Sequence, residues 1–306
     1  MAKVVGVGPA VVSADRRFLR RLHAFVVLMK LRIIELLLIT TLPVMFVAAK
    51  TVPSPKLVLC TLVAGTLSAA GANVGNMVYD KDIDALMKRT KSRPLVTGAV
   101  STREAIVFAC ALEVTAFVIF ATTVNVLSGV LSIGAALFYL LIYTMWLKRR
   151  SVSNIVIGGA AGALPPVIGW TAVTDHLAIA PVICFAIVFV WTPPHFWALA
   201  TKYREDYAAA SVPMLPVVAE ETTVNRQILV YTVVVVALSF LLAPFAHLGV
   251  LYLVVASMAG LEFLWRAIAL QRSPGTKSAM RVFGSSIRYL SFVFVAMGLD
   301  ALLRHP

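Results

Sequence analysis

The sequence predicts an all-α, polytopic membrane protein with nine transmembrane helices. Of its 306 residues, 60% are hydrophobic and only 13% are charged, and the mean hydropathy is +0.91. The apolar residues gather in runs of about 20, which is the length that an α-helix needs to cross a bilayer. Basic residues concentrate in alternate connections between these runs. Together, these observations favour a bundle of membrane-spanning helices over a soluble domain.

Nine apolar runs define the expected spans. The break between the seventh and the eighth rests on Pro244 and Gly249 alone. The expected spans cover residues 33–49, 57–79, 105–124, 127–146, 153–173, 178–199, 228–245, 247–265 and 284–303.

The placement of Lys and Arg predicts the orientation, because basic residues near span ends are retained in the cytoplasm. With the N-terminus in the cytoplasm, all but three of the 27 Lys and Arg residues fall on that side; the exceptions are Lys50, Lys56 and Arg304. The net charge of +13 is then a topology signal that needs no nucleic-acid partner. We expect a bacterial inner-membrane protein with a basic cytoplasmic tail at 1–32, one transmembrane domain at 33–303, and polar cytoplasmic loops at about 80–103 and 200–226.

Asn76, Asp80 and Asp84 follow one another at intervals of four at the end of the second span. Steps of four advance about 40° around a helix, so these side chains form one polar ridge, whereas Asp82 lies about 200° from Asp80 and should point elsewhere. Two carboxylates at this spacing repel, which suggests a cation between them. Carboxylates beside a basic cluster suit Mg²⁺ carrying a phosphorylated substrate. A solvated turn in which the acids and bases neutralise each other explains the same residues equally well.

A second polar group follows the sixth span. If that span continues as a helix, His195, Lys202 and Asp206 share one face within about 40°. An ordinary Lys202–Asp206 helix pair is the simpler interpretation of this group taken alone. Two polar ridges at span ends on the same side nevertheless favour a shared pocket.

Several segments resemble the intramembrane prenyltransferases of the UbiA type and, more narrowly, the protohaem IX farnesyltransferases, which are also called haem O synthases. The first aspartate-rich motif of that superfamily is similar to the run from Asn76 to Pro94. The resemblance extends from about Lys30 to Leu290 and includes Tyr143–Arg149, Asn154–Trp170, Pro194–Trp197, Glu205–Pro216 and, more weakly, Thr223–Gln227 and Ser286–Leu290.

This resemblance implies a helical bundle whose central cavity opens near the cytoplasmic face. It implies Mg²⁺-dependent transfer of a farnesyl group from farnesyl diphosphate to a vinyl group of haem b, giving haem O for a terminal oxidase. Asp80, Asp84 and Asn76 match the first motif as ligands of Mg²⁺ and diphosphate, and Asp206 matches the last acid of the second motif. Lys202 stands where the wider superfamily usually has an acid, and fits the haem branch. The candidate diphosphate clamps are Arg89, Arg93, Lys148, Arg149 and Lys202.

The acceptor site is expected at His195 and Trp197. His195 is either an axial or propionate contact to haem, or it satisfies a backbone carbonyl that Pro193 and Pro194 set free. Trp191 and Trp197 either stack on the porphyrin or belong to the interfacial aromatic belt, and we favour the belt.

Three further acids, Glu35, Glu113 and Glu262, lie in or at the ends of spans. Each is expected to face the bundle, hydrogen-bonded or protonated, because a charge exposed to lipid is costly. A role for them at the substrate is the less favoured interpretation.

Two rival functions remain open on the sequence alone. An aromatic prenyltransferase of quinone synthesis would share the metal chemistry, although the segments Pro194–Trp197 and Glu205–Pro216 argue against it. A transporter or a non-catalytic haem-binding protein would have no need of a diphosphate clamp. The resemblance also implies a possible haem A synthase as the partner that receives the product.

Overall fold

The computed structural model describes residues 14–304, and the regular structure of this part is entirely helical. Nine segments of it are long and apolar enough to cross a membrane, and each overlaps one of the nine predicted spans. They are Leu31–Ala49 (α2), Pro55–Tyr79 (α3), Thr102–Val124 (α5, Thr102–Ile119, and η1, Phe120–Val124), Val126–Leu147 (α6, Val126–Leu137, and η2, Phe138–Leu147), Asn154–Thr174 (α7, Asn154–Gly162, and α8, Pro165–Thr174), Ile179–Lys202 (α9), Glu221–Phe245 (α12), Val250–Arg272 (α13) and Thr276–Arg304 (α14).

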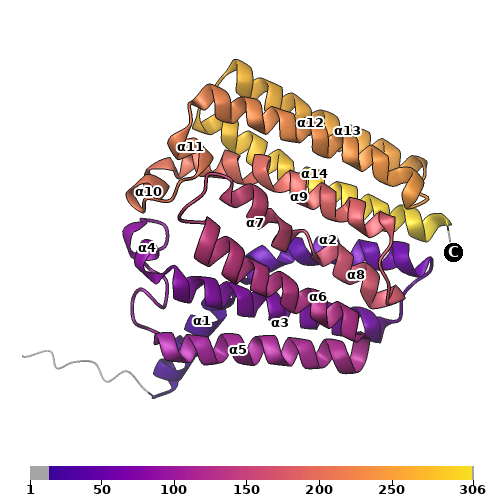
Figure 1. The fold of residues 1–306 in the computed structure, drawn as a ribbon. Coiled ribbons are helices and arrows are strands. Elements are labelled where there is room, and N and C mark those ends of the chain that lie inside the picture. The colour runs from indigo at the N-terminus through magenta and orange to yellow at the C-terminus, as the bar shows by residue number, and fades with distance from the viewer. Residues whose placement is uncertain (1–13, 305–306) are drawn as a thin grey trace, which may run out of the picture.

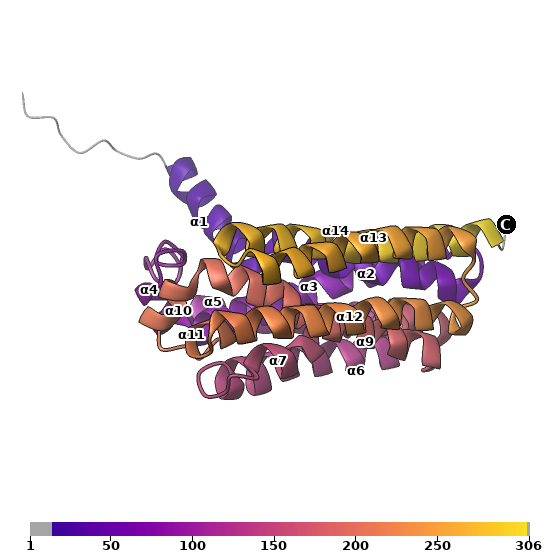
Figure 2. The same ribbon diagram turned by 90° about the horizontal axis from the view of Figure 1, so that it is seen from above.

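The long helices lie side by side, and the short ones gather at one end of the bundle (Figure 1). The short helices α4 (Lys81–Leu86), α10 (Arg204–Ala209) and α11 (Leu215–Val218) belong to the two polar loops predicted to be cytoplasmic. In the view from above, the same three helices sit together at the end opposite the C-terminus (Figure 2). The two polar loops, far apart in sequence, therefore meet over one end of the bundle.

Helix starts follow the local sequence. Ser101 and Glu104 form a capping box at the first turn of α5, which satisfies amide groups that have no partner within the helix. Ser54 accepts from Leu57 N at the start of α3, where Pro55 occupies the first turn. At the opposite end of the molecule, the buried carboxylate of Asp300 on α14 accepts from Gly249 N at 2.7 Å, at the start of α13.

The third and fourth spans each change from α-helical to π-helical winding before they end, in η1 and η2. The fourth span continues from α6 into η2, a ten-residue π-helix that stops immediately before Lys148. Such segments are rare and usually brief. Hydropathy predicted the span but not this winding, which sets the direction of Tyr139, Tyr143 and Thr144.

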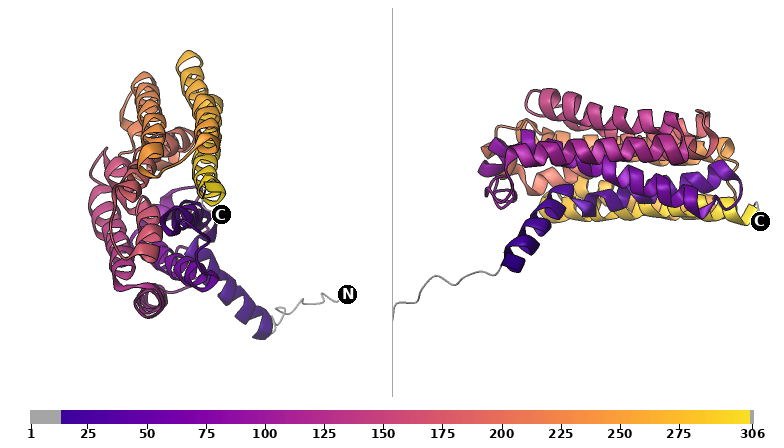
Figure 3. Two further views of the ribbon diagram at one scale, coloured as in Figure 1. Left: turned by 90° about the vertical axis from the view of Figure 1, so that its right-hand side faces the viewer. Right: turned by 90° about the horizontal axis from the view of Figure 1, so that it is seen from below.

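Residues 14–29 form a further helix, α1 (Ala14–Met29), where the sequence analysis expected only a basic tail. The helix leaves the bundle at an angle (Figure 3). It is joined to α2 by Lys30, whose backbone is left-handed at φ 53°.

Candidate active site

The predicted ridge is formed at the end of α3. Although α3 ends at Tyr79, the backbone ladder continues from Asp80 N to Asn76 O and from Asp84 N to Asp80 O, at 2.9 and 2.8 Å. The three side chains therefore keep their helical spacing, and all three are buried. Asn76 Nδ2 donates to Asp80 Oδ2 at 2.8 Å, so the amide and the first carboxylate are in direct contact.

Each buried acid is paired with a cation from another segment. Lys148, which follows η2, forms an ion pair with Asp80, and Arg93 forms one with Asp84. The side chain of Asp80 is fully buried, and those of Lys148 and Arg93 are largely buried. Two buried carboxylates are tolerated here because each has an opposite charge close to it.

Asp82 points away from these pairs, as its position on the helix predicted. Its side chain is 64% exposed. Arg149 donates to both of its oxygens at 2.6 and 2.7 Å and to Tyr79 O at 3.0 Å. These hydrogen bonds hold the pKa of the Asp82 carboxyl below its ordinary value. Arg149, one of the predicted clamps, is thus engaged at the rim.

Lys30, the elbow that connects α1 and α2, also contacts the site, although it was not among the predicted site residues. Its Nζ donates to Asn76 Oδ1 at 3.0 Å. Burial lowers the pKa of Lys30 to about 7, and the positive charges of Arg93 and Lys148 act in the same direction. The only sign of this role in the sequence was a lysine beside the first apolar run. A lysine that extends its ammonium group from the end of a span into water explains such a residue equally well.

The π-helix supplies the remaining partner of the Asn76 amide. Thr144, fully buried on η2, accepts from Asn76 Nδ2 at 3.1 Å and donates to Tyr139 O at 2.8 Å. Tyr139 and Tyr143 stack with ring centroids 5.4 Å apart, and Tyr143 packs directly over Gly158. The orientation of Asn76 is thus fixed from three sides, by Lys30, Asp80 and Thr144.

The second predicted ridge does not form, because α9 ends at Lys202. Tyr203 departs from helical geometry at φ −107° and ψ 24°, and α10 begins at Arg204. Asp206 instead accepts from the backbone amides of Lys88 and Arg89, both at 3.3 Å. The expectation of one continuous helical face was wrong, but this contact does bring the two polar loops together.

Two predicted clamps lie at the outer rim, on the Tyr203 ring. The guanidinium of Arg89 is 5.1 Å from the ring centroid, and Lys202 Nζ is 5.3 Å from it. Both are exposed residues. The structure therefore places Arg93 and Lys148 beside the buried acids, with Arg149 Nη2 3.9 Å from Asp80 Oδ1, and it places Arg89 and Lys202 further out.

His195, on α9, packs against α14. Trp191 and Phe283 stack on its two faces at centroid distances of 4.2 and 4.6 Å. Its Nδ1 is 2.8 Å from Ser286 Oγ. The hypothesis that it bonds a freed backbone carbonyl is therefore wrong, because the partner of its Nδ1 is a side-chain hydroxyl.

The two tryptophans are buried within the bundle, so the aromatic-belt interpretation is also wrong. Trp191 Nε1 donates to Ser286 O at 2.8 Å, which ties it to α14. Trp197 packs edge-on against Tyr231, and its buried Nε1 has no hydrogen-bond partner in the structure. A buried N–H without an acceptor is uncommon in proteins.

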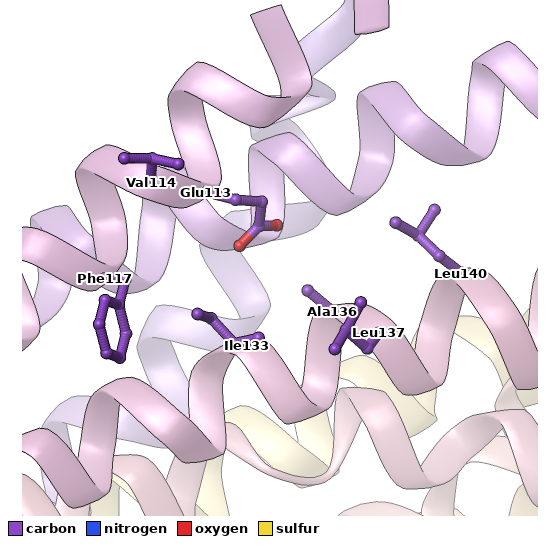
Figure 4. A pocket seen from close by; sticks show the side chains of 7 residues that line it. All are labelled: Glu113, Val114, Phe117, Ile133, Ala136, Leu137 and Leu140. Atoms are coloured by element: carbon purple, nitrogen blue, oxygen red, sulfur yellow. The ribbon is translucent and has the colours of Figure 1, made fainter. Parts of the chain in front are cut away.

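The remaining glutamates lie outside the site. Glu262 pairs with Arg288, whereas Glu35 is exposed, contrary to expectation. Glu113 accepts from Ser68 Oγ at 2.9 Å and lines a cavity of about 200 Å³ between α5 and α6, together with apolar residues such as Phe117 and Ile133 (Figure 4). None of the candidate site residues lines this cavity.

The donor atoms at the buried ridge suit a small, hard divalent cation. Asp80 Oδ1 is buried without a hydrogen-bond partner, and the neighbouring donors are carboxylate and amide oxygens. Within residues 14–304, no three Asp, Glu, His or Cys side chains form a metal cluster by themselves. Mg²⁺ characteristically binds one or two carboxylates and completes its shell with substrate phosphates and water. The ridge therefore fits a metal that arrives with a phosphorylated substrate.

The nine-span bundle, with paired acids and cations beneath two polar loops, defines an intramembrane enzyme of the prenyltransferase class. The UbiA prenyltransferase family model matches residues 37–294. Two curated relatives, both called protoheme IX farnesyltransferase, come from Streptomyces avermitilis and Streptomyces coelicolor. The first is 53% identical over 95% of this chain and 97% of the relative, and the second is 52% identical over 97% and 96%. The chain belongs to the UbiA prenyltransferase family and, within it, to the protoheme IX farnesyltransferases.

Solved structures share the fold at low sequence identity. A digeranylgeranylglyceryl phosphate synthase has a TM-score of 0.76 and 19% identity, and the match covers 92% of this chain and 99% of that one. A UbiA homolog from Archaeoglobus fulgidus bound to DMAPP and Mg²⁺ has a TM-score of 0.62 and 16% identity, covering 88% and 98%. At these identities the likeness establishes the fold alone.

Proposed function

We propose that the protein transfers the farnesyl group of farnesyl diphosphate to a vinyl group of haem b, producing haem O for a terminal oxidase. The observation that carries this proposal is the buried series Asn76–Asp80–Asp84 with Lys148 and Arg93 against it, in a chain about half identical to protoheme IX farnesyltransferases. The reaction would take place at the cytoplasmic end of an inner-membrane protein whose N-terminus is cytoplasmic. The product would then pass to a haem A synthase where haem A is needed.

The diphosphate would bind at the ridge. Asp80, Asp84 and Asn76 would hold Mg²⁺, which neutralises charge on the departing diphosphate. Arg93 and Lys148, which form ion pairs with Asp84 and Asp80, would contact the phosphate oxygens. Arg149, Arg89 and Lys202 would guide the anion from the rim.

Asp206 would link the two loops over the bound diphosphate. It already accepts from the amides of Lys88 and Arg89, and so holds the turn that carries Arg89. Each carboxylate oxygen has a second lone pair, which would remain for the metal. We therefore keep Asp206 as a proposed ligand in addition to its contact with the backbone.

The haem would be held near His195, and the hydrogen-bond network indicates how. Ser286 Oγ donates its single proton to Phe283 O at 2.7 Å, so it must accept from His195 Nδ1–H. The neutral imidazole of this tautomer would present its Nε2 lone pair to the iron, as an imidazole ligand requires. Trp197 lies about 200° from His195 on α9 and packs against Tyr231, so a contact of its indole N–H with the acceptor stays a prediction.

The chemistry follows from charge. The allylic C–O bond breaks and its electron pair leaves with the diphosphate, stabilised by fixed cations rather than by a general base. The vinyl carbon of haem b attacks C1 of the farnesyl cation, and water adds to the resulting porphyrin cation and releases a proton. The product carries a hydroxyethylfarnesyl group. The apolar bundle would limit the access of other water to the cation.

The test is to incubate the purified protein in detergent with haem b, farnesyl diphosphate and Mg²⁺, and to analyse the products by chromatography and mass spectrometry. The expected result is a haem whose mass has increased by one farnesyl group and one hydroxyl group. Parallel reactions with a phenolic and a naphthoate acceptor serve as controls. Prenylation of either ring in place of haem would overturn the proposed acceptor.

A further inference from the structure

Helix α1 carries an apolar stripe that no other segment of residues 14–304 covers. Phe18, Leu19, Leu22 and Val26 are 68, 60, 52 and 41% exposed. At 100° per residue they occupy one sector of about 100° on the helix. An uncovered apolar stripe of this kind on a helix marks an interaction surface.

The face of α1 that adjoins the stripe, centred about 120° from it, is packed against the bundle. Leu28 and Ala24 are buried, and Phe25 meets Phe108 of α5 edge-on at 5.0 Å. Arg21 forms an ion pair with Glu104 in the first turn of α5. These contacts fix the rotation of α1 about its own axis, so its apolar stripe has a defined direction.

The stripe is continuous with the surface that faces lipid. The contacts with Glu104 and Phe108 set α1 beside the first two turns of α5, a membrane span whose Ile106 and Val107 are also exposed. The far end of α1 slopes away from the bundle (Figure 3). The helix therefore lies at the level where the span enters the membrane.

The charge of the helix selects the lipid. The segment from Ala14 to Met29 contains four arginines, at 16, 17, 20 and 21, against the single acid Asp15. Arg20 is exposed and lies about 200° from Phe18, on the flank away from the apolar stripe. An apolar face with arginines beside it is the pattern of a helix that lies in an anionic membrane surface.

We propose that α1 is an interfacial helix that inserts its Phe18–Val26 stripe into a leaflet containing anionic phospholipid, and that this docking stabilises the substrate site. The link to the site is the elbow after α1. Asn73 Nδ2 donates to Met29 O at 3.2 Å, and Lys30 donates to Asn76. When α1 is docked, it holds this elbow against α3. It thereby also maintains the contact of Lys30 with the Asn76 amide.

A fluorescent reporter tests the docking. Leu22→Cys is labelled with an environment-sensitive dye in full-length protein in which Cys60, Cys110 and Cys184 are replaced by Ala. The protein is reconstituted into phosphatidylcholine vesicles with or without phosphatidylglycerol. Phosphatidylglycerol is expected to shift the emission of the dye to the blue and to lower its quenching by iodide at least threefold.

Two matched variants sharpen this test. The same dye at Arg20→Cys, on the flank away from the stripe, should remain accessible to iodide in both kinds of vesicle. Replacing Arg16, Arg17 and Arg20 by Gln should remove the effect of phosphatidylglycerol on the dye at position 22. Equal spectra in the two lipids, or equal shielding at positions 20 and 22, would overturn the proposal. A blue shift of the dye that is present in detergent and disappears on dilution would also overturn the proposal. It would show that the stripe binds a second copy of the chain.

A kinetic readout examines the link to the site and rests on the proposed function. KM for farnesyl diphosphate is expected to rise three- to tenfold in neutral vesicles, with kcat changing less than twofold. An unchanged KM would overturn the link. The dye signal needs no turnover, so a docked helix in a protein that fails to farnesylate haem would count against the proposed function and leave the docking standing.

Discussion

Thr144→Val probes whether the π-helix orients the catalytic amide. Valine has nearly the same shape as threonine but lacks the hydroxyl. Thr144 is fully buried, accepts from Asn76 and donates to Tyr139 O. The substitution therefore leaves one amide N–H and one carbonyl with fewer partners while the packing is almost unchanged.

The expected cost follows from these two groups. A buried polar group that loses its partner costs roughly 1–3 kcal/mol. Greater burial of apolar surface by the added methyl group offsets about 1 kcal/mol. For the two groups together, the free energy of unfolding should fall by about 1–5 kcal/mol. If about 1.4–2.7 kcal/mol of this reflects a misoriented Asn76 in the transition state, kcat/KM falls roughly 10- to 100-fold.

The assay combines thermal unfolding in detergent with the rate of farnesyl transfer. Thr144→Ser keeps the hydroxyl and should stay within threefold of the wild-type rate. Thr232→Val removes an equally buried hydroxyl far from the site, one that donates to Ile228 O at 2.7 Å, and should leave the rate unchanged. The reasoning fails if Thr144→Val matches Thr144→Ser in both stability and rate.

Three further predictions concern packing, capping and the metal. Gly158→Ala places a Cβ 2.2 Å from Tyr143 Cδ2, so stability should drop by about 1–3 kcal/mol along with activity; Gly162→Ala, which meets nothing within 4 Å, is the control, and equal melting temperatures would contradict the packing argument. Asp300→Ala removes the acceptor for Gly249 N and should cost about 0.5–2 kcal/mol in a melting experiment with KM for farnesyl diphosphate unchanged; a raised KM would show that its role is not confined to the cap. Chelation by EDTA should abolish transfer and added Mg²⁺ should restore it, while haem absorbance shows the acceptor still bound; turnover that persists in EDTA would contradict a metal-dependent step.

The extent to which the sequence predicted this structure depends on how local each signal is. The nine spans were predictable because hydropathy and charge act within single segments. The ridge of Asn76, Asp80 and Asp84 was equally local, since its ladder continues past the end of α3. The second ridge failed at Tyr203, where a single non-helical residue separates Lys202 from Asp206.

Other parts of the site depend on contacts between distant segments. The pairing of Lys148 with Asp80 joins residues 68 positions apart, and their proximity follows from the way η2 packs beside α3. The π-winding itself leaves no periodic trace in an apolar run. Lys30 and the apolar stripe of α1 were visible as residues, but only the packed bundle distinguishes a buried lysine from a solvated one.

The central claim is that the buried ridge, and not the acid at its rim, drives ionisation of the diphosphate. The most direct measurement is the rate of diphosphate release in saturating Mg²⁺ for Asp80→Asn, Asp84→Asn and Asp82→Asn, each with haem b present. The first two variants should lose at least a hundredfold, because each removes one of the two buried charges of the ridge. Asp82→Asn should stay within about threefold of wild type, since its exposed carboxylate bonds only to Arg149 in the structure. Equal losses in all three, or wild-type release by Asp80→Asn, would contradict the account.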